Sequence, residues 1–257
     1  MGGQDEFGRG PGENQGLDFR DLRVSLPEVT SVELNNKISV IIPTKDEEET
    51  IREVIRGVKP YARDIIIVDG HSKDSTREIA QQEKVKVILD NGKGKGDALK
   101  VGIKEATEGI LVFMDSDGSH EASDIPRLIE PILQGKADLV IGSRIRGGSD
   151  ELHGNISKFV RGVGSGIITL IINWRWKTML TDCENGFRAI DRQKCLSLNL
   201  RANDFNIEQE MVMKCLKKEY IVTEVPSHEY ERKGGRLKLI VWKKWYKFLW
   251  TLIRWIF

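Results

Sequence analysis

Cysteine is scarce in this 257-residue sequence. It contains three cysteines, Cys183, Cys195 and Cys215, and no two of them form a C-x-x-C pair. An odd number with this spacing argues against a disulfide framework and a zinc site. The first residues also lack the apolar segment of a secretory signal peptide. We therefore expect the chain to work in a reducing compartment.

Histidine is scarce as well. The four histidines, His71, His120, His153 and His228, form no recognisable Ser-His-Asp or H-E-x-x-H arrangement. We expect each of them to be structural rather than catalytic. His120 is the one most worth testing, because it lies beside two aspartates.

A clear basic excess is also missing, since 40 basic residues face 39 acidic ones and the formal net charge is +1. Proteins that bind nucleic acid usually carry such an excess, so this class is disfavoured. The charge is nevertheless uneven along the chain. No acidic residue follows Glu231, whereas these basic residues do: Arg232, Lys233, Arg236, Lys238, Lys243, Lys244, Lys247 and Arg254. A run of one sign indicates an anionic partner for this end.

From Lys37 onward, short apolar runs alternate with helical patterns. Strands are predicted at 38–43, 64–69, 85–89, 110–114 and 138–141, with a helix after each of the first four. This alternation at short spacing predicts an α/β fold with a mainly parallel sheet. Residues 1–36 are rich in glycine and polar residues near their start, and we interpret them as a disordered N-terminal arm.

The pattern becomes less regular after Gly142. The apolar stretch 163–172, within a helix at 157–176, is too short to cross a bilayer and predicts a packed or interfacial helix. A strand is predicted at 187–190, a helix at 207–218, a last strand at 221–226 and a terminal helix at 237–257.

Aspartates follow the first, second and fourth predicted strands. The clearest case is D-S-D, Asp115 to Asp117, at the end of an apolar run. In open α/β sheets, ligands bind outside the carboxyl ends of the strands, and two carboxylates there can hold a divalent cation that also binds phosphates. Helix capping is the alternative for a single D-S-D, but it explains three clusters poorly. A nucleotide site at this edge is therefore the better interpretation.

A dinucleotide enzyme of the Rossmann type would carry G-x-G-x-x-G after the first strand. P-T-K-D-E stands there instead, so this class is excluded. The glycines of N-G-K-G-K-G, from Asn91 to Gly96, follow the third strand and lack the G-K-[ST] of a P-loop. Their amides could face phosphate or ribose, or they could form a flexible turn.

The ordered motifs V-I-I-P-T-x-x-E, I-I-V-D-G-x-S-x-D-x-T, G-K-G-x-A-L, D-S-D, G-S-R and G-F-R-A resemble the family 2 glycosyltransferases of GT-A fold. Within them, the chain is most similar to the dolichyl-phosphate sugar synthases, meaning the mannose synthase and its archaeal hexose and N-acetylhexosamine relatives. The resemblance covers roughly residues 38–238. Three motifs depart from the family pattern: D-S-D replaces D-A-D, the second-strand turn reads D-G-H-S in place of D-D or D-G-S, and Leu237 replaces the serine of R-x-x-G-x-S-K.

The resemblance implies a role for particular residues. Nucleotide contacts are implied for Pro43, Thr44, Glu47, Asp69, Lys95 and Asp115. Asp115 and Asp117 would hold Mg²⁺ or Mn²⁺. The residues implied in catalysis are Asp117, Arg144, Arg188 and Glu210, and those implied in binding a lipid phosphate are Arg232, Lys233 and Lys238. Glu208 and Glu210 cannot share one helix face, so we expect only one of them, Glu210, in the site.

The predicted terminal helix, 237–257, contains four of the six tryptophans and would place Lys244, Lys247, Thr251 and Arg254 on one polar stripe. It would be about 31 Å long, but crossing a bilayer would bury lysines at roughly 2.5–3.5 kcal/mol each. Lying in the interface keeps these cations among anionic headgroups. An amphipathic interfacial helix is thus favoured over a tail packed on its own domain.

These expectations give a GT-A domain at 37–236 followed by a membrane-associating helix at 237–257. The predicted activity is transfer of a hexose or N-acetylhexosamine from a nucleotide sugar to dolichyl or polyprenyl phosphate, with inversion, at the cytoplasmic face of a membrane. No nucleic acid partner is expected. The alternatives are a soluble glycosyltransferase with a small phosphorylated acceptor, and a non-catalytic nucleotide-sugar binder docked on the membrane.

Overall fold

The computed structural model describes residues 37–150, 156–234 and 241–256, so the predicted N-terminal arm lies outside the described residues. The strands are β1 (Ile38–Thr44), β2 (Asp64–Asp69), β3 (Lys86–Leu89), β4 (Ile110–Phe113), β5 (Leu139–Ser143), β6 (Arg188–Asp191) and β7 (Val222–Pro226). The helices are α2 (Ile51–Val58), α3 (Thr76–Gln82), α4 (Lys95–Glu105), η1 (Ala122–Asp124), α5 (Ile125–Leu133), α6 (Arg144–Gly147), α7 (Ile156–Trp176), α8 (Arg192–Ser197), α9 (Ile207–Lys217) and α10 (Val241–Ile256).

The seven strands form one sheet in the order β3-β2-β1-β4-β6-β5-β7. All neighbouring pairs are parallel except the two that involve β6, which runs antiparallel to β4 and to β5. The mainly parallel sheet is therefore confirmed. Because β6 is reversed, its start lies at the same sheet edge as the ends of β4 and β5, and the turn that precedes β6 reaches that edge.

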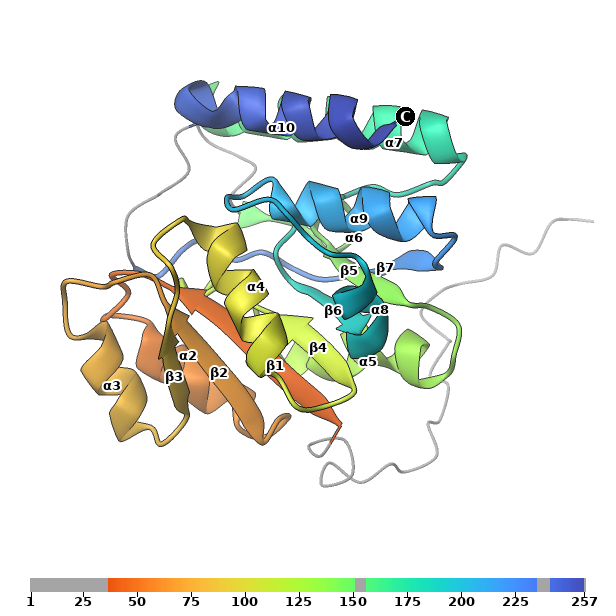
Figure 1. The fold of residues 1–257 in the computed structure, drawn as a ribbon. Coiled ribbons are helices and arrows are strands. Elements are labelled where there is room, and N and C mark those ends of the chain that lie inside the picture. Colours follow the sequence, from red (N-terminus) through yellow and green to blue (C-terminus); the bar gives the residue numbers. More distant parts are fainter. Residues whose placement is uncertain (1–36, 151–155, 235–240, 257) are drawn as a thin grey trace, which may run out of the picture.

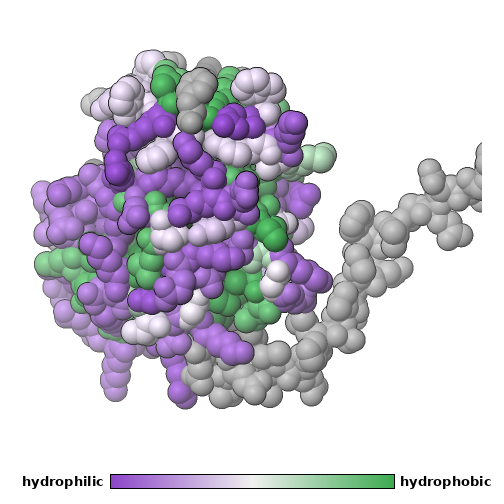
Figure 2. Space-filling model, turned by 45° about the vertical axis from the view of Figure 1, so that its right-hand side comes forward, coloured by the Kyte–Doolittle hydropathy of each residue, from purple (hydrophilic) through white to green (hydrophobic). Residues whose placement is uncertain are grey.

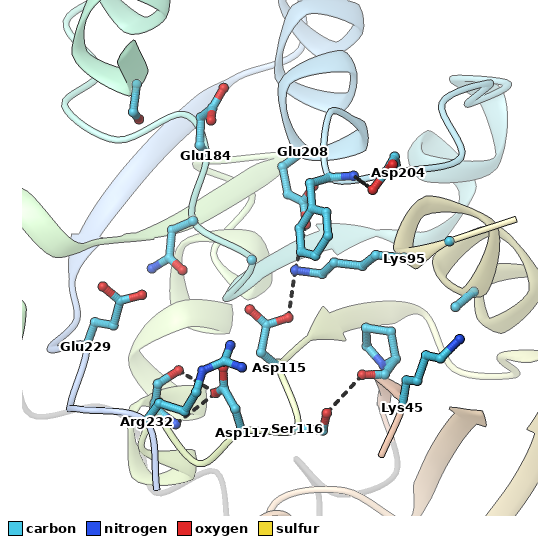
Figure 3. Close-up of a pocket in the computed structure, with 18 of the residues that line it drawn as sticks. Lys45, Lys95, Asp115, Ser116, Asp117, Glu184, Asp204, Glu208, Glu229 and Arg232 are labelled. Atoms are coloured by element: carbon cyan, nitrogen blue, oxygen red, sulfur yellow. Dashed lines mark hydrogen bonds and ion pairs between the residues drawn. The ribbon is translucent and has the colours of Figure 1, made fainter. Parts of the chain in front are cut away.

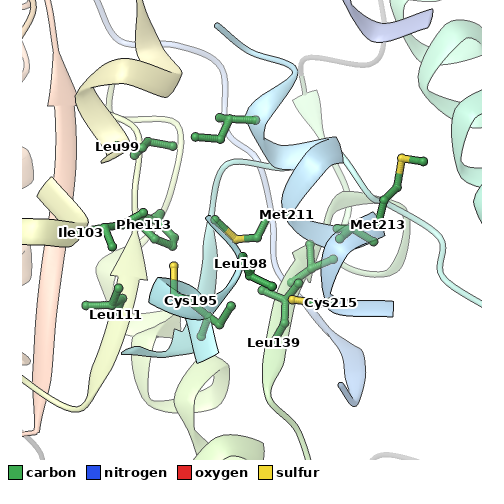
Figure 4. Packing of buried hydrophobic residues seen from close by; sticks show 14 of the residues in the cluster. Leu99, Ile103, Leu111, Phe113, Leu139, Cys195, Leu198, Met211, Met213 and Cys215 are labelled. Atoms are coloured by element: carbon green, nitrogen blue, oxygen red, sulfur yellow. The ribbon is translucent and has the colours of Figure 1, made fainter. Parts of the chain in front are cut away.

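Buried side chains pack on both faces of the sheet. Alternate residues of a strand point to opposite faces, and in β1 Ile41 packs toward α4 and α9 whereas Val40 and Ile42 pack toward α2 and α5. Figure 4 shows part of the first cluster, in which Phe113 of β4 and Leu99 of α4 take part. These continuous apolar strands match the near-uniform Ile and Val content expected of a sheet covered on both sides.

The three cysteines belong to this core. All are buried and free of disulfide bonds, and burial raises the pKa of each thiol, to about 12 for Cys183 and Cys215. They act as small apolar side chains.

Helices α7 and α10 form a further layer outside α9, at one end of the molecule (Figure 1). Thr251, on the inner side of α10, accepts a hydrogen bond from the Asn206 amide at 2.7 Å, and Lys247 pairs with Asp204 at 2.8 Å. Arg175 of α7 donates to the carbonyl of Ile256 at 2.7 Å. Part of the predicted polar stripe of the terminal helix thus faces the domain.

The outer sides of these two helices are apolar and exposed. We call them the amphipathic platform, defined by these exposed side chains: Val163, Ile167, Leu170 and Trp174 of α7, with Trp245, Tyr246, Leu249, Trp250 and Ile253 of α10. Trp174 is 78% exposed and Trp250 61%. In Figure 2, green and pale side chains gather at this end, above a mostly purple body. Among the described residues, no helix has the length and apolar character needed to span a bilayer.

Candidate active site

A pocket of about 550 Å³ opens at the carboxyl ends of β1, β4 and β5. This is the edge at which ligands bind in open α/β sheets. Its lining includes residues from these parts of the chain: Pro43 to Lys45 at the end of β1, Gly92 to Lys95 at the start of α4, Asp115 to Asp117 after β4, Arg144 after β5, Thr181, Asp182 and Glu184 to Gly186 before β6, and Asp204, Phe205 and Glu208 around α9. The polar edge predicted from the sequence is therefore one concave site.

The D-S-D loop, Asp115 to Asp117, is held in place by its central serine. The Ser116 hydroxyl donates to the carbonyl of Pro43 at 3.1 Å, and the Thr50 hydroxyl donates to the carbonyl of Ser116 at 2.7 Å. These bonds tie the loop to β1 and to the start of α2. With the serine turned inward, both aspartates face the pocket (Figure 3).

Asp115 forms an ion pair with Lys95, whose ammonium nitrogen lies 2.6 Å from the carboxylate and 2.9 Å from that of Glu208. Burial alone would lower the pKa of Lys95, but the charges of Asp115 and Glu208 outweigh it and raise the pKa. Burial also acts to raise the pKa of Asp115, and the charge of Lys95 outweighs it, so that this pKa is lowered. Both side chains therefore remain charged in the pocket.

Asp117 forms a second ion pair, with Arg232, at 2.6 Å. Its other carboxylate oxygen accepts hydrogen bonds from the amide and hydroxyl of Ser119, at 3.1 and 2.7 Å. Arg232 lies in the segment after β7, and it reaches the D-S-D loop from the side opposite Lys95 (Figure 3).

Arg144 is fixed by two acids. Its guanidinium donates to Asp182 at 2.6 and 2.9 Å and lies 3.4 Å from Glu229. Glu224 in turn accepts from the amides of Thr181 and Asp182, at 2.8 and 2.7 Å. Burial would lower the pKa of Arg144, but the charge of Asp182 raises it. Arg144 lines the pocket, and its predicted contact with a phosphate stays a prediction.

Of the two acids on α9, the structure places Glu208 in the pocket and not Glu210. The Glu210 carboxylate is buried, accepts from the amides of Arg201 and Ala202, and pairs with Lys214 at 2.7 Å. The assignment of Glu210 as the site acid is therefore wrong, although only one of the two was expected in the site. The rotation of α9, set by the burial of Ile207 and Met211, decides the choice.

The prediction of a catalytic role for Arg188 is also wrong. It is 0% exposed, and its guanidinium donates to the backbone carbonyls of Cys183, Asn185 and Glu208. A side chain enclosed in this way has no access to a substrate phosphate. Arg188 instead holds the turn before β6 against the start of α9.

Among the predicted nucleotide contacts, Pro43, Thr44 and Glu47 line the pocket. Asp69 does not; its carboxylate accepts from the amide of Ser72 at 3.0 Å and from the Ser72 hydroxyl. It shapes the turn after β2, and Gly70 of that turn lines the pocket instead. The assignment of Asp69 to direct nucleotide binding is wrong in this structure.

The cationic residues of the segment after β7 lie in different places. Arg232 lines the pocket, whereas Lys233 pairs with Glu53 at 2.6 Å outside it. Lys233 therefore does not join the predicted phosphate cluster, and Lys238 lies outside the described residues.

His120 is buried and stacks on Phe187 with ring centroids 5.2 Å apart. Burial lowers its pKa despite the nearby charges of Asp115 and Glu229.

The glycines of N-G-K-G-K-G have a packing role. A Cβ on Gly94 would lie 2.7 Å from the carbonyl oxygen of Asn203, and one on Gly96 would lie 2.7 Å from that of Ala202. Only glycine allows the start of α4 to approach the segment before α9 so closely. This contact brings Lys95 within reach of Glu208.

Sequence reasoning missed several residues of the pocket. Lys45, Asp182, Glu184 and Glu229 line it, as do Gly162, Ser165 and Gly166 of α7 and Phe248 of α10. The signal for Asp182 and Glu184 in the sequence is their place just before N-G-F-R-A.

No group of three or more His, Cys, Asp or Glu side chains suited to a metal ion is present in the described part of the chain. Asp115 and Asp117 remain as a pair of carboxylates facing the pocket. Mg²⁺ is commonly held by one or two carboxylates together with substrate phosphates. The donor set thus fits a cation that arrives with a diphosphate.

A mostly parallel sheet with a D-S-D loop and a pocket at its carboxyl edge defines a GT-A-like fold. The chain belongs to glycosyl transferase family 2, whose model matches residues 39–198. It is 32% identical over 200 residues to glycosyltransferase AglJ of Haloferax volcanii, covering 77% of this chain and 64% of AglJ. It is 31% identical over 240 residues to the UDP-N-acetylglucosamine–dolichyl-phosphate N-acetylglucosaminyltransferase of Methanococcus voltae, covering 82% and 94%.

Solved structures confirm the fold. Glucosyl-3-phosphoglycerate synthase of Mycobacterium tuberculosis, in complex with Mg²⁺ and UDP, superposes with a TM-score of 0.69 at 21% identity, covering 89% of this chain and 84% of that one. The same synthase with Mn²⁺, UDP-glucose and phosphoglyceric acid gives 0.68 at 21%, with 90% and 85% covered.

Proposed function

We propose that this chain transfers a hexose or N-acetylhexosamine from a GDP- or UDP-linked sugar to dolichyl or polyprenyl phosphate. The observation that carries the proposal is the continuity of the pocket with the amphipathic platform. The same cavity is lined by the D-S-D loop and by Gly162, Ser165 and Phe248 of the platform helices. A phosphate on a lipid held at the platform would lie close to the donor diphosphate.

The Methanococcus voltae relative supports the acceptor class, because its name gives dolichyl phosphate as its acceptor. The two glucosyl-3-phosphoglycerate synthase complexes support a donor bound with Mg²⁺ or Mn²⁺, since their titles give these ions together with UDP or UDP-glucose. Asp115 and Asp117 would hold such a cation together with the diphosphate, and it would supply positive charge to stabilise the leaving group.

In this proposal, the residues of the chain act mainly by placing two phosphate groups side by side. Pro43, Thr44 and Glu47 line the part of the pocket that receives the nucleotide. Arg144 and Arg232 hold the acceptor phosphate. A phosphate monoester is largely ionised at neutral pH, with a second pKa of about 6. Its oxygen can attack the anomeric carbon without a strong base. The bond from that carbon to the diphosphate then breaks, the nucleoside diphosphate leaves, and the configuration at the carbon is inverted. The enclosed His120 fits this absence of a required base.

The amphipathic platform supports contact with a membrane surface, and we propose that this surface is the cytoplasmic face. Tryptophan and tyrosine suit the depth of the headgroups. We expect the chain to float with vesicles that contain anionic lipid. The double variant Trp245→Ser/Trp250→Ser should stay in the dense fraction, while its rate toward a water-soluble short-chain polyprenyl phosphate is retained.

A second candidate is transfer to a small phosphorylated acceptor, favoured by the fold shared with glucosyl-3-phosphoglycerate synthase. One experiment separates the two. Wild-type protein is incubated with sugar nucleotide and Mn²⁺, and with either polyprenyl phosphate in vesicles or 3-phosphoglycerate in solution. Product on the lipid alone supports our proposal, and product on phosphoglycerate alone overturns it. Donor binding without turnover on either acceptor would indicate a non-catalytic binder.

A further inference from the structure

The pocket contains an acidic side chain that the proposed reaction does not use. Glu184 lies in the turn between α7 and β6 and lines the same cavity as the D-S-D loop. In the view of Figure 3, Glu184 and Glu208 lie on the opposite side of Asp115 from Asp117 and Arg232. The question is what this carboxyl contacts.

The backbone around Glu184 is firmly held. Its amide donates to the Asp182 carboxylate at 3.3 Å, and Asp182 is itself fixed by Arg144. On the other side, the Asn185 side chain donates to the carbonyl of Gly142. The chain is thus anchored at Asp182 and Asn185, on either side of Glu184.

The Glu184 carboxyl group can form a further hydrogen bond. Its Oε1 atom is buried and has no hydrogen-bond partner among the described residues. Buried polar atoms are nearly always satisfied in folded proteins, and an exception calls for an explanation. A ligand that fills the pocket would supply the missing partner.

The charges around Glu184 favour its protonated form. Burial and the negative charges of Glu208 and Asp182 raise its pKa to about 8, against the opposing charges of Arg144 and Arg188. Both arginines are already engaged, the first by Asp182 and the second by carbonyl oxygens. A carboxyl that keeps its proton can both donate and accept a hydrogen bond, as a sugar hydroxyl or an amide requires.

The position of the turn indicates which part of a ligand Glu184 meets. The nucleotide end of the pocket is bounded by β1 and the turns after β2 and β3, and the diphosphate belongs at the D-S-D loop. A Cβ added to Gly186 would lie 2.7 Å from Oδ2 of Asp115, so this turn packs directly against the loop. Glu184 and Glu208 line the pocket beyond Asp115, which leaves this part of it for the transferred sugar.

We propose that Glu184 contacts a hydroxyl or amide group of the donor sugar and so determines which sugar is accepted. This inference rests on the proposed function and names a residue that selects its substrate. Sites that pair with a polar substituent reject analogues lacking it strongly, because the buried partner is then left unsatisfied. Glu184 is thus assigned to specificity and not to the bond-making step.

The test compares affinities by calorimetry in the presence of Mn²⁺. The ligands are UDP, GDP, UDP-glucose, UDP-N-acetylglucosamine and GDP-mannose, and the proteins are wild type, Glu184→Gln and Glu184→Ala. We expect unchanged affinity for the nucleoside diphosphate. The alanine variant should lose about tenfold or more of the preference for the best sugar nucleotide over its diphosphate, and the glutamine variant should retain part of it. Glu78→Gln, at an exposed position on α3, is the matched control.

Two results would overturn the inference: equal losses for diphosphate and sugar nucleotide, which indicate a structural role, or no change with any ligand. Failure of the proposed function is recognised separately. In that case the wild-type protein binds none of the sugar nucleotides, and the assignment of Glu184 falls with it.

Discussion

Arg232 and Asp117, which are 115 positions apart, both line the pocket and form an ion pair of 2.6 Å. The guanidinium contacts an oxygen of the Asp117 carboxylate to which a divalent cation would also bind. Binding of such a cation at the D-S-D loop therefore competes with a cation of the chain itself, and the two states should be separable by substitution.

The first prediction concerns this competition. Arg232→Gln should bind Mn²⁺ more tightly in the absence of nucleotide, by about fivefold, since a partly exposed ion pair contributes roughly 1 kcal/mol. Titration followed by electron paramagnetic resonance measures free Mn²⁺ directly. Lys233→Gln is the control, because its ammonium pairs with Glu53 and not with the D-S-D loop. Equal affinities in wild type and Arg232→Gln would show that the ion pair does not compete with the metal.

The second prediction concerns Arg144. Arg144→Ala should lower the rate of sugar transfer at least ~100-fold, the usual effect of removing a positioned charge from a reacting phosphate. Circular dichroism should show an unchanged fold. Arg127→Ala, on the outer side of α5, should keep wild-type activity. A wild-type rate for Arg144→Ala would refute its role in holding the acceptor.

The third prediction separates the two acids of α9. Glu208→Gln should reduce donor affinity or turnover with little loss of stability, because it removes one of the two charges on Lys95. Glu210→Gln should instead lower the free energy of unfolding by about 1–3 kcal/mol, since it weakens bonds to two backbone amides and to Lys214. Urea denaturation and steady-state kinetics on both variants would distinguish the roles. The reverse pattern would restore Glu210 as the site acid.

The fourth prediction concerns Arg188. Arg188→Met should destabilise the protein by several kcal/mol, because three buried carbonyl groups lose their donor at about 1–3 kcal/mol each. The melting temperature measures this effect, and any loss of activity should follow the loss of folded protein. A stable but inactive variant would mean that Arg188 does reach a substrate.

The fifth prediction is a pH dependence of stability. The pKa of Glu184 is about 8 in the folded chain and 4.5 without the fold, so the folded state holds the proton more tightly. The contribution of Glu184 to the free energy of unfolding is fully present below pH 4.5 and is lost as the pH rises toward 8. The free-energy gain of Glu184→Gln over wild type should therefore increase by roughly 1–3 kcal/mol between pH 5 and pH 8. Urea denaturation at pH 5 and pH 8 measures this difference. The same change in the free energy of unfolding for wild type and variant would contradict the prediction.

Local pattern predicted the strands well. The predicted strand at 64–69 matches β2, and the others agree with their strands within one or two residues at each end, because apolar runs ended by polar residues are a local property. The direction of β6 was not predictable in this way, since it depends on pairing with β4 and β5. The short helices α6 and α8 were missed because four and six residues show too little periodicity.

The site was predicted in outline and less well in detail. The D-S-D loop, Lys95 and Arg144 follow strands or begin helices at the pocket edge, so the motif position fixes their place. Arg188 and Glu210 belong to motifs of equal strength, but one residue of strand register or a partial turn of helix decides which side a side chain takes. That choice is made by packing, which the motifs do not encode.

The turn between α7 and β6 has a mechanical consequence. Asn173, on the last turns of α7, holds the start of the following turn by donating to the carbonyl of Leu180 at 2.8 Å and accepting from its amide at 3.0 Å. Two positions later, Asp182 grips the guanidinium of Arg144. Under the proposed membrane contact, a shift of α7 would be transmitted through these hydrogen bonds to Arg144, the residue that we assign to the acceptor phosphate.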